Sequence, residues 1–396
     1  MSMRFCRVIG TFSVLLLNGV AAHAQLAAVD TAAAPTALEA AVDRAAADIL
    51  LTKTVAGFAV GIARGGEVAL VKGYGFADLE DGIKVGPDTV FRVGSVTKEF
   101  TAASVLLLAE RGQLSLDDRL SKYLPDFPRA SEVTLRQLLN HTSGISNYTS
   151  VPGFMKVEGT QPNTTIEMTD YIGKITPLYD FAPGTSWNYS NSGYMLLGAV
   201  IEKVSGQSFG AFMKANITVP LGMKDTAIDE LTQIVPGRAD GYEIDKASAT
   251  GFANASFIAM EAAGAAGAVR STVGDLLKWH DALLGGRLLK PASVALMTQP
   301  ARLVDGRLAS AARAAIPGIT PTQAAALAGD YGMGIMVRSI KGRRSIGHGG
   351  SINGFNASLN SFPDDRLVVV ALTNTGGGAG AVVPPVLDAL FAQPKP

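Results

Sequence analysis

Ser95 and Lys98 are the residues of this chain whose types and spacing most directly suggest covalent chemistry. The residues from Ser95 to Gly112 predict a helix, and a spacing of three places both side chains on one face of it. A serine hydroxyl becomes a good nucleophile when a base takes its proton, and a lysine whose pKa is lowered by burial can be that base. The start of a helix also offers backbone N–H groups that favour an oxyanion. Alone, the same pattern fits an N-capping serine and an ordinary helical lysine.

A second group of candidate residues is Tyr189 and Asn191, which follow the Pro183-Gly184 break and precede a helix predicted over about 192–204. A phenol can shuttle protons if a nearby ammonium holds it as a phenolate. The amide of Asn191 could hold Lys98 or a substrate carbonyl. The alternative is a packing tyrosine followed by an ordinary asparagine cap.

The third group is the run from Gly347 to Ser351 at the end of a predicted strand. Glycines at a strand end let another backbone or a ligand approach closely. A backbone N–H in this run could pair with that of Ser95 to form an oxyanion hole. His348 could donate a hydrogen bond to a substrate or to Tyr189, or it could be a satisfied strand histidine.

Residues 1–24 have the pattern of a signal peptide. Two arginines precede an apolar stretch over 8–20, and small residues at 22 and 24 fit a cleavage site. The apolar stretch is shorter than the about 20 residues that span a bilayer. We therefore expect an exported protein, periplasmic or secreted, whose mature chain 25–396 lacks Cys6, the only cysteine, and so has no disulfide or thiol chemistry.

The composition narrows the classes of partner. The 34 basic and 34 acidic residues balance, and no basic run would follow a phosphate backbone, so we expect no nucleic-acid partner. His141, His280 and His348 lie far apart in the sequence, which disfavours a histidine metal site. No cofactor, no membrane span and no obligate protein partner are predicted. The expected partner is a small-molecule ester, amide or peptide substrate.

Elements that must position these residues are strands at both ends of the chain with helices between them. The predicted strands cover 57–63, 68–75, 332–338, 343–348, 355–362 and 367–373, and a last helix covers about 382–392. This order predicts an α/β fold, in which an antiparallel sheet is built from both chain ends, flanked by helices, and interrupted by an inserted, mostly α-helical region. The α/β part would comprise about 37–95 and 330–396 and the helical part about 96–329, in one domain with a cleft between the parts.

The three groups taken together, in this order, resemble the serine β-lactamase and penicillin-binding-protein superfamily, specifically its class C branch. That branch includes class C β-lactamases, D-Ala-D-Ala carboxypeptidases, D-aminopeptidases and family VIII carboxylesterases. The resemblance covers nearly all of the mature chain and extends to the loops at 138–145 and 182–185. His141 matches a position in the first loop and is interpreted as structural. The resemblance implies a β-lactamase/transpeptidase-like fold.

For the site, the resemblance implies that Ser95 is acylated and that Lys98 is its base or the partner of the base. Tyr189 would protonate the leaving group and help to activate the deacylating water, while Asn191 would orient Lys98 and the substrate. The backbone N–H groups of Ser95 and Ser351 would stabilise the oxyanion. Either Lys98 or Tyr189 could be the acylation base, since such a pair titrates as a coupled unit.

The third group departs from the family pattern. Where relatives have Lys-Thr-Gly or His-Thr-Gly, this chain has His348-Gly349-Gly350, without the hydroxyl that helps to hold a substrate carboxylate. Losing a charge-assisted bond of this kind costs about 1.5–3 kcal/mol. This change argues against efficient β-lactam hydrolysis.

The predicted function is therefore a serine hydrolase acting through an acyl-enzyme on Ser95, esterase-like on small esters or amides. The alternatives are a D-Ala-D-Ala carboxypeptidase or D-aminopeptidase, and then a β-lactamase. A non-catalytic binding protein on the same fold is a more remote alternative, because Ser95, Lys98 and Tyr189 are all present.

Overall fold

A computed structural model describes residues 36–313 and 328–392 of the 396-residue chain. The predicted signal peptide, 1–24, lies outside these ranges. The helices and strands discussed here belong to the unit that begins at Ala37. In the described part of the chain, no helix is both long enough and apolar enough to cross a membrane.

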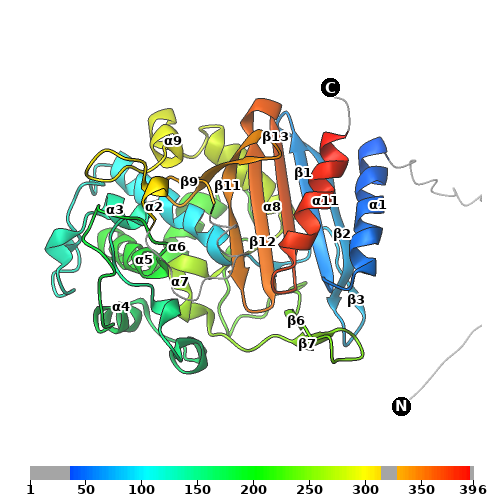
Figure 1. Cartoon of the computed structure of the whole chain (residues 1–396), viewed down its shortest axis with the longest axis horizontal. Helices are drawn as coiled ribbons and strands as arrows, with labels where there is room; N and C mark the ends of the chain where they lie inside the picture. Colours follow the sequence, from blue (N-terminus) through cyan, green and yellow to red (C-terminus); the bar gives the residue numbers. More distant parts are fainter. Residues whose placement is uncertain (1–35, 314–327, 393–396) are drawn as a thin grey trace, which may run out of the picture. The chain divides into compact units, whose positions relative to one another are not determined.

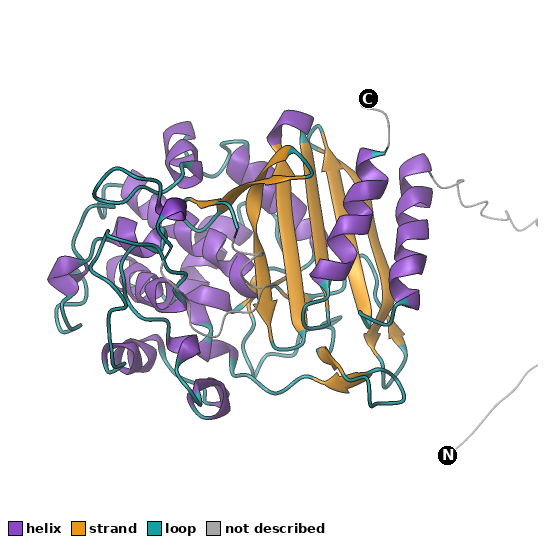
Figure 2. Ribbon diagram, viewed as in Figure 1, coloured by secondary structure: helices purple, strands orange, loops and turns teal. Residues whose placement is uncertain are grey.

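An eight-stranded antiparallel sheet unites the two ends of the described chain (Figures 1 and 2). Its strands, in spatial order, are β3 (Ile83–Lys84), β2 (Glu67–Asp78), β1 (Gly57–Arg64), β13 (Leu367–Thr373), β12 (Phe355–Phe362), β11 (Arg343–Ile352), β10 (Met336–Ile340) and β9 (Asp330–Tyr331). The central pairing joins β1 to β13, with Gly61 opposite Val370. The predicted sheet built from both chain ends is thereby confirmed.

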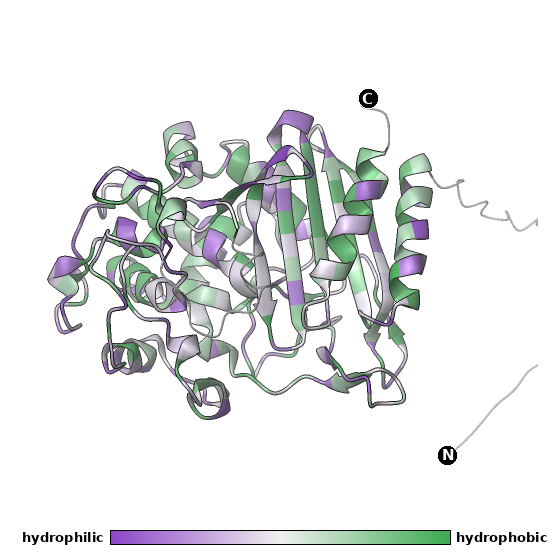
Figure 3. Ribbon diagram, viewed as in Figure 1, coloured by the Kyte–Doolittle hydropathy of each residue, from purple (hydrophilic) through white to green (hydrophobic). Residues whose placement is uncertain are grey.

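Both faces of this sheet are covered, which explains why β1 and β13 are almost continuously apolar. Helices α1 (Ala37–Leu51) and α11 (Ala379–Phe391) pack side by side on one face (Figure 1). Figure 3 shows many hydrophobic residues along both helices, and residues of both helices pack against Phe58, Val60 and Val369 of the sheet. Helix α8 (Val273–Leu284) packs against β1 and β13, close to Gly61.

The helical region lies beside the β11 side of the sheet (Figure 2). It contains α2 (Thr97–Glu110), α3 (Leu135–Leu139), α4 (Thr165–Gly173), α5 (Asn191–Ser205), α6 (Phe209–Met213), α7 (Gly264–Gly267) and α9 (Pro291–Thr298). Helix α2 is buried on all sides from Thr97 to Leu108, including its polar residues Lys98, Glu99 and Thr101. It therefore provides a rigid support for the residues at its start.

Short strands also occur in the segment predicted to be mostly helical. Strands β8 (Val269–Ser271) and β5 (Ala227–Ile228) form a three-stranded sheet with β4 (Phe91–Arg92), which lies just before that segment, and β6 (Tyr242–Ile244) and β7 (Phe252–Asn254) form a hairpin. Strands of two or three residues are too short to show a two-residue period. Sequence periodicity therefore does not reveal them.

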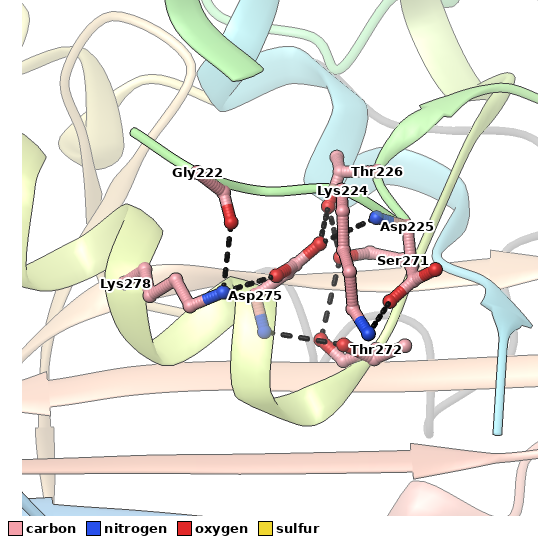
Figure 4. Close-up of polar contacts among 8 residues, drawn as sticks. All are labelled: Gly222, Lys224, Asp225, Thr226, Ser271, Thr272, Asp275 and Lys278. Carbon is pink, nitrogen blue, oxygen red and sulfur yellow. Dashed lines mark hydrogen bonds and ion pairs between the residues drawn. The ribbon is translucent and has the colours of Figure 1, made fainter. Parts of the chain in front are cut away.

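A buried carboxylate fixes β8 relative to α8 (Figure 4). Asp275, near the start of α8, accepts hydrogen bonds from Asp225 N–H at 2.9 Å and from Thr226 Oγ1 at 3.0 Å, and pairs with Lys278 at 2.9 Å. Thr226 Oγ1 also lies 2.7 Å from Ser271 Oγ on β8. These contacts anchor the strand that directly follows α7.

The strand predicted over 332–338 is interrupted in the structure. Residues 330–331 and 336–340 form separate strands, because Gly334 has a φ of +71° and turns the chain between them. An ideal Cβ at Gly334 would lie 2.5 Å from the Lys98 carbonyl oxygen. Glycine is thus required for this turn to pack against α2.

Candidate active site

Ser95 lies in a 3-10 turn, Gly94–Val96, that leads directly into α2. The sequence predicts helix from Ser95, whereas the α-helix itself begins at Thr97. Thr97 Oγ1 donates to the Gly94 carbonyl at 2.7 Å and accepts from Val269 N–H of β8 at 3.0 Å. The turn that carries Ser95 is therefore tied to the strand anchored by Asp275.

Lys98 lies one turn further and is completely buried. Its Nζ is 3.1 Å from Ser95 Oγ, 2.7 Å from Asn191 Oδ1 and 2.8 Å from the Ala266 carbonyl oxygen. Burial lowers the pKa of the Lys98 ammonium well below its usual value. A neutral amine has two hydrogens and one lone pair. Donation to Asn191 and Ala266 therefore leaves the lone pair to accept from Ser95.

Tyr189 completes the arrangement around Ser95. Its ring centroid lies 4.8 Å from Lys98 Nζ. Burial raises the pKa of the Tyr189 phenol above its usual value, and a hydrogen bond with Ser95 acts in the opposite direction. A phenol of raised pKa beside a lysine of lowered pKa is protonated at neutral pH. This state differs from the phenolate considered in the sequence analysis.

Asn191 begins α5 and is held by two residues that the sequence analysis missed. Its backbone N–H donates to Asn147 Oδ1 at 3.0 Å, and its Nδ2 donates to Thr149 Oγ1 at 3.0 Å. With Nδ2 engaged in this way, Oδ1 faces Lys98. Asn147 and Thr149 follow the loop at 138–145, so their position just after a recognised loop was the available signal.

His348 has a different hydrogen-bond partner from the one predicted. The side chain is buried, its Nε2 lies 2.9 Å from Tyr331 Oη, and its Nδ1 contacts the Gly349 carbonyl oxygen. The Tyr189 ring is 6.2 Å away between centroids, so the partner is Tyr331 and not Tyr189. Burial, with the nearby Lys98, lowers the pKa of the His348 imidazole to about 3. His348 is neutral at pH 7 and accepts from Tyr331.

The glycines after His348 let β11 lie directly against the Ser95 turn. An ideal Cβ at Gly350 would lie 1.9 Å from the Val93 carbonyl oxygen and 3.0 Å from Ser95 N. An ideal Cβ at Gly94 would lie 2.8 Å from Ser351 N. The two backbone segments whose N–H groups were predicted to form an oxyanion hole are therefore in direct contact. By contrast, Gly349 has room for a side chain, with Ala357 O at 3.6 Å as its neighbour.

A cavity of about 370 Å³ opens beside these residues. Ser95, Asn191 and Ser351 line it, together with apolar side chains that include Tyr148, Phe154 and Ile258. Among residues 36–313 and 328–392, no group of three His, Cys, Asp or Glu side chains is arranged to hold a metal ion. The arrangement presents a nucleophile, a buried amine, a phenol and two backbone donors beside one cavity.

The sequence profile of the family described as Beta-lactamase matches residues 38–393. The chain belongs to the β-lactamase family. Members of this family act as serine acyl-transfer hydrolases, and the eight-stranded sheet with its helices is the fold of the family.

Proteins similar to this chain include a penicillin-binding protein, an esterase and an amidase. This β-lactamase family member is 28% identical to penicillin-binding protein 4* of Bacillus subtilis (strain 168) over 323 residues. The aligned region covers 79% of this chain and 66% of that protein. It is 35% identical over 216 residues to esterase EstB of Burkholderia gladioli, covering 50% and 52% of the two chains. The chain thus spans about two thirds of the first relative and about half of the second.

Among solved structures, the D-amino acid amidase of Ochrobactrum anthropi SV3 in complex with L-phenylalanine amide superposes with a TM-score of 0.75. The two chains are 26% identical, and the match covers 90% of this chain and 99% of the amidase. The similarity to the amidase therefore extends over nearly its whole length.

Proposed function

We propose that this protein is an exported serine hydrolase that forms an acyl-enzyme on Ser95 and acts on small esters or amides. The observation that carries the proposal is the 3.1 Å contact between Ser95 Oγ and the buried Nζ of Lys98. Export rests on the signal-peptide pattern of residues 1–24 alone.

In this proposal, neutral Lys98 accepts the Ser95 proton as Oγ attacks the substrate carbonyl. The backbone N–H groups of Ser95 and Ser351 receive the negative charge that develops on the carbonyl oxygen. The phenol of Tyr189 then protonates the leaving alcohol or amine, so that the C–O or C–N bond breaks and the acyl group stays on Ser95. Water attacks the ester in the second step, and its proton passes to the Tyr189–Lys98 pair as Ser95 regains its own.

The residues at His348-Gly349-Gly350 favour esters and neutral amides as substrates over molecules with a carboxylate beside the reacting carbonyl. His348 is neutral at pH 7 and bonded to Tyr331, and Gly349 has no hydroxyl to offer. Esterase EstB is an esterase by name, which agrees with this preference. Hydrolysis of D-amino-acid amides or peptides is the second candidate, favoured by the near full-length similarity to the D-amino acid amidase. β-Lactam hydrolysis ranks third.

Trapping the nucleophile tests the proposal. A fluorophosphonate should label Ser95, and Ser95→Ala should abolish both labelling and turnover with the fold intact. The chain offers a matched control in Ser361, which lies 2.8 Å from His280 Nδ1, while His280 Nε2 lies 2.9 Å from Glu99. This serine–histidine–carboxylate group is separate from the Ser95 site and is buried, so the fluorophosphonate should still label Ser95 in the Ser361→Ala variant.

The substrate is then ranked by assaying p-nitrophenyl esters, nitrocefin, D-amino-acid amides and D-Ala-D-Ala peptides side by side. A fluorophosphonate adduct mapped to a serine other than Ser95 would overturn the proposed mechanism. Turnover of nitrocefin well above that of the esters would overturn the proposed substrate order.

A further inference from the structure

The cavity beside Ser95 contains a carboxylate that the proposed chemistry does not use. Glu243, on β6, lines the cavity, and among the described lining residues it is the one with a formal charge. The other side chains that line it are apolar or neutral, including Tyr148, Phe154 and Ile258. A substrate in this cavity therefore meets a single negative charge on a wall of apolar and neutral polar side chains.

The carboxylate of Glu243 is held in place at the end of the β11–β12 hairpin. Its Oε1 accepts a hydrogen bond from Gly354 N–H at 3.0 Å. Gly376, on the other side, leaves room for it, because an ideal Cβ there would collide with Glu243 Oε2. Gly354 is three residues after Ser351, and Ser95, Ser351 and Glu243 all line the same cavity. The carboxylate is therefore bonded to Gly354 and not to Ser351, whose N–H would bind the reacting carbonyl, so we place it at a separate point of the cavity wall.

No protein cation neutralises this carboxylate in the described part of the chain. Its described hydrogen bond comes from a neutral backbone group, and no ion pair joins it. Lys98 lines the interior behind Ser95 and donates to Asn191 and Ala266. Glu243 is exposed, so a bound ligand can reach it.

We propose that Glu243 is a specificity residue that favours acyl donors carrying a cationic group several bonds from the reacting carbonyl. The proposal rests on the hydrolase function proposed above and narrows its substrate class. An apolar spacer of the acyl group would lie on the apolar wall while its cation pairs with the carboxylate. The same charge would repel a substrate carboxylate placed there.

A pair of isosteric esters tests this inference directly. p-Nitrophenyl 4-(trimethylammonio)butanoate and p-nitrophenyl 5,5-dimethylhexanoate have the same shape and leaving group and differ in the acyl charge. In the full-length protein, Glu243→Gln should lower the ratio of kcat/KM for the cationic ester over the neutral ester by about three- to tenfold. Glu243→Lys should lower it further. Added salt should reduce the ratio in the unsubstituted protein, since the carboxylate is exposed.

Glu67 on β2 provides a matched control, because it is an exposed glutamate outside the cavity. Glu67→Gln should leave the ratio unchanged. The unsubstituted protein, Glu243→Gln and Glu243→Lys could all have the same ratio of kcat/KM for the cationic ester over the neutral ester. If so, and if turnover still depends on Ser95, the inference about Glu243 is wrong and the proposed function stands. If Ser95 is not labelled and neither ester is hydrolysed, the proposed function falls and this inference falls with it.

Discussion

The Nζ atom of Lys98 lies 3.1 Å from Ser95 Oγ on a side chain that is completely buried. Because two other acceptors, Asn191 Oδ1 and Ala266 O, surround the same nitrogen, both hydrogens of a neutral amine are used. The remaining lone pair faces the serine hydroxyl. This arrangement favours Lys98 as the acylation base and Tyr189, whose pKa is raised by burial, as the acid.

Lys98 and Tyr189 should act as one unit. Lys98→Ala and Tyr189→Phe are each expected to lower kcat/KM for a p-nitrophenyl ester by about 10²- to 10⁴-fold, the usual contribution of a positioned acid or base. The double variant should be little worse than the poorer single variant, because proton transfer fails once either partner is lost. Losses that add in log rate would show that the two residues act independently.

His141 should position Tyr189 through the backbone on both sides of it. Its carbonyl accepts from Asn188 N–H at 3.1 Å, its Nδ1 accepts from Ser190 N–H at 3.2 Å, and its ring centroid lies 4.4 Å from that of Tyr189. His141→Ala is expected to lower kcat by about tenfold or more with a small change in KM. His141 has a φ of +63°, which asparagine tolerates well, so His141→Asn should recover part of kcat.

This assignment of His141 is checked by comparing kcat, KM and thermal unfolding for the two variants. If His141→Ala and His141→Asn lose kcat equally, or if KM alone changes, His141 does not act through Tyr189.

His348 should make the protein sensitive to acid. In the folded state its pKa is about 3, whereas an unfolded histidine titrates near 6.5. As the pH falls below about 6.5, the unfolded chain takes up a proton that the folded protein does not. The free energy of unfolding therefore falls with decreasing pH, by up to about 1.4 kcal/mol per pH unit, until the pH approaches 3.

His348→Gln should remove this contribution while keeping an acceptor for Tyr331. The contribution of His348 is measured by urea unfolding of both proteins at pH 7, 6, 5 and 4. From pH 7 to pH 5, the unfolding free energy of the variant should rise relative to that of the unsubstituted protein by on the order of 2 kcal/mol. Parallel curves would contradict the assigned pKa. Other buried groups, such as His141 and Lys98, remain in both proteins, so they enter the difference only through their coupling to His348.

Gly349→Thr should restore part of the missing carboxylate clamp. Gly349 has no positive φ, its Cβ would meet Ala357 O at an ordinary 3.6 Å, and it shares a face of β11 with Ser351, which lines the cavity. The ratio of nitrocefin to p-nitrophenyl butyrate turnover should rise by about tenfold, the value of one charge-assisted hydrogen bond. Adding His348→Lys is expected to destabilise the protein, since position 348 is buried against Tyr331.

Gly349→Ala is the matched control for the hydroxyl, because it adds the Cβ alone. If the alanine and threonine variants have the same turnover ratio, the clamp explanation fails and β-lactams regain equal standing as substrates.

The sequence alone determined the features that depend on neighbouring residues. Ser95 and Lys98 are three residues apart, so the helical period places them on one face, and β12 and β13 occupy the ranges predicted for these two strands. The order of strands and helices likewise predicted a sheet built from both chain ends. The order of the three motifs predicted the family, and the profile match over 38–393 confirmed it.

Tertiary structure alone decided which groups meet across the site. The hydrogen bond between Gly354 and Glu243 joins residues 111 positions apart, and that of Lys98 with the Ala266 carbonyl joins residues 168 apart. Tyr331, the partner of His348, lies just before the strand predicted over 332–338, of which only 336–338 is strand, because the chain turns at Gly334. Sequence periodicity reports which face of an element is buried. The partner of a buried polar group is instead set by the packing of distant segments, each of which must satisfy its own hydrogen bonds.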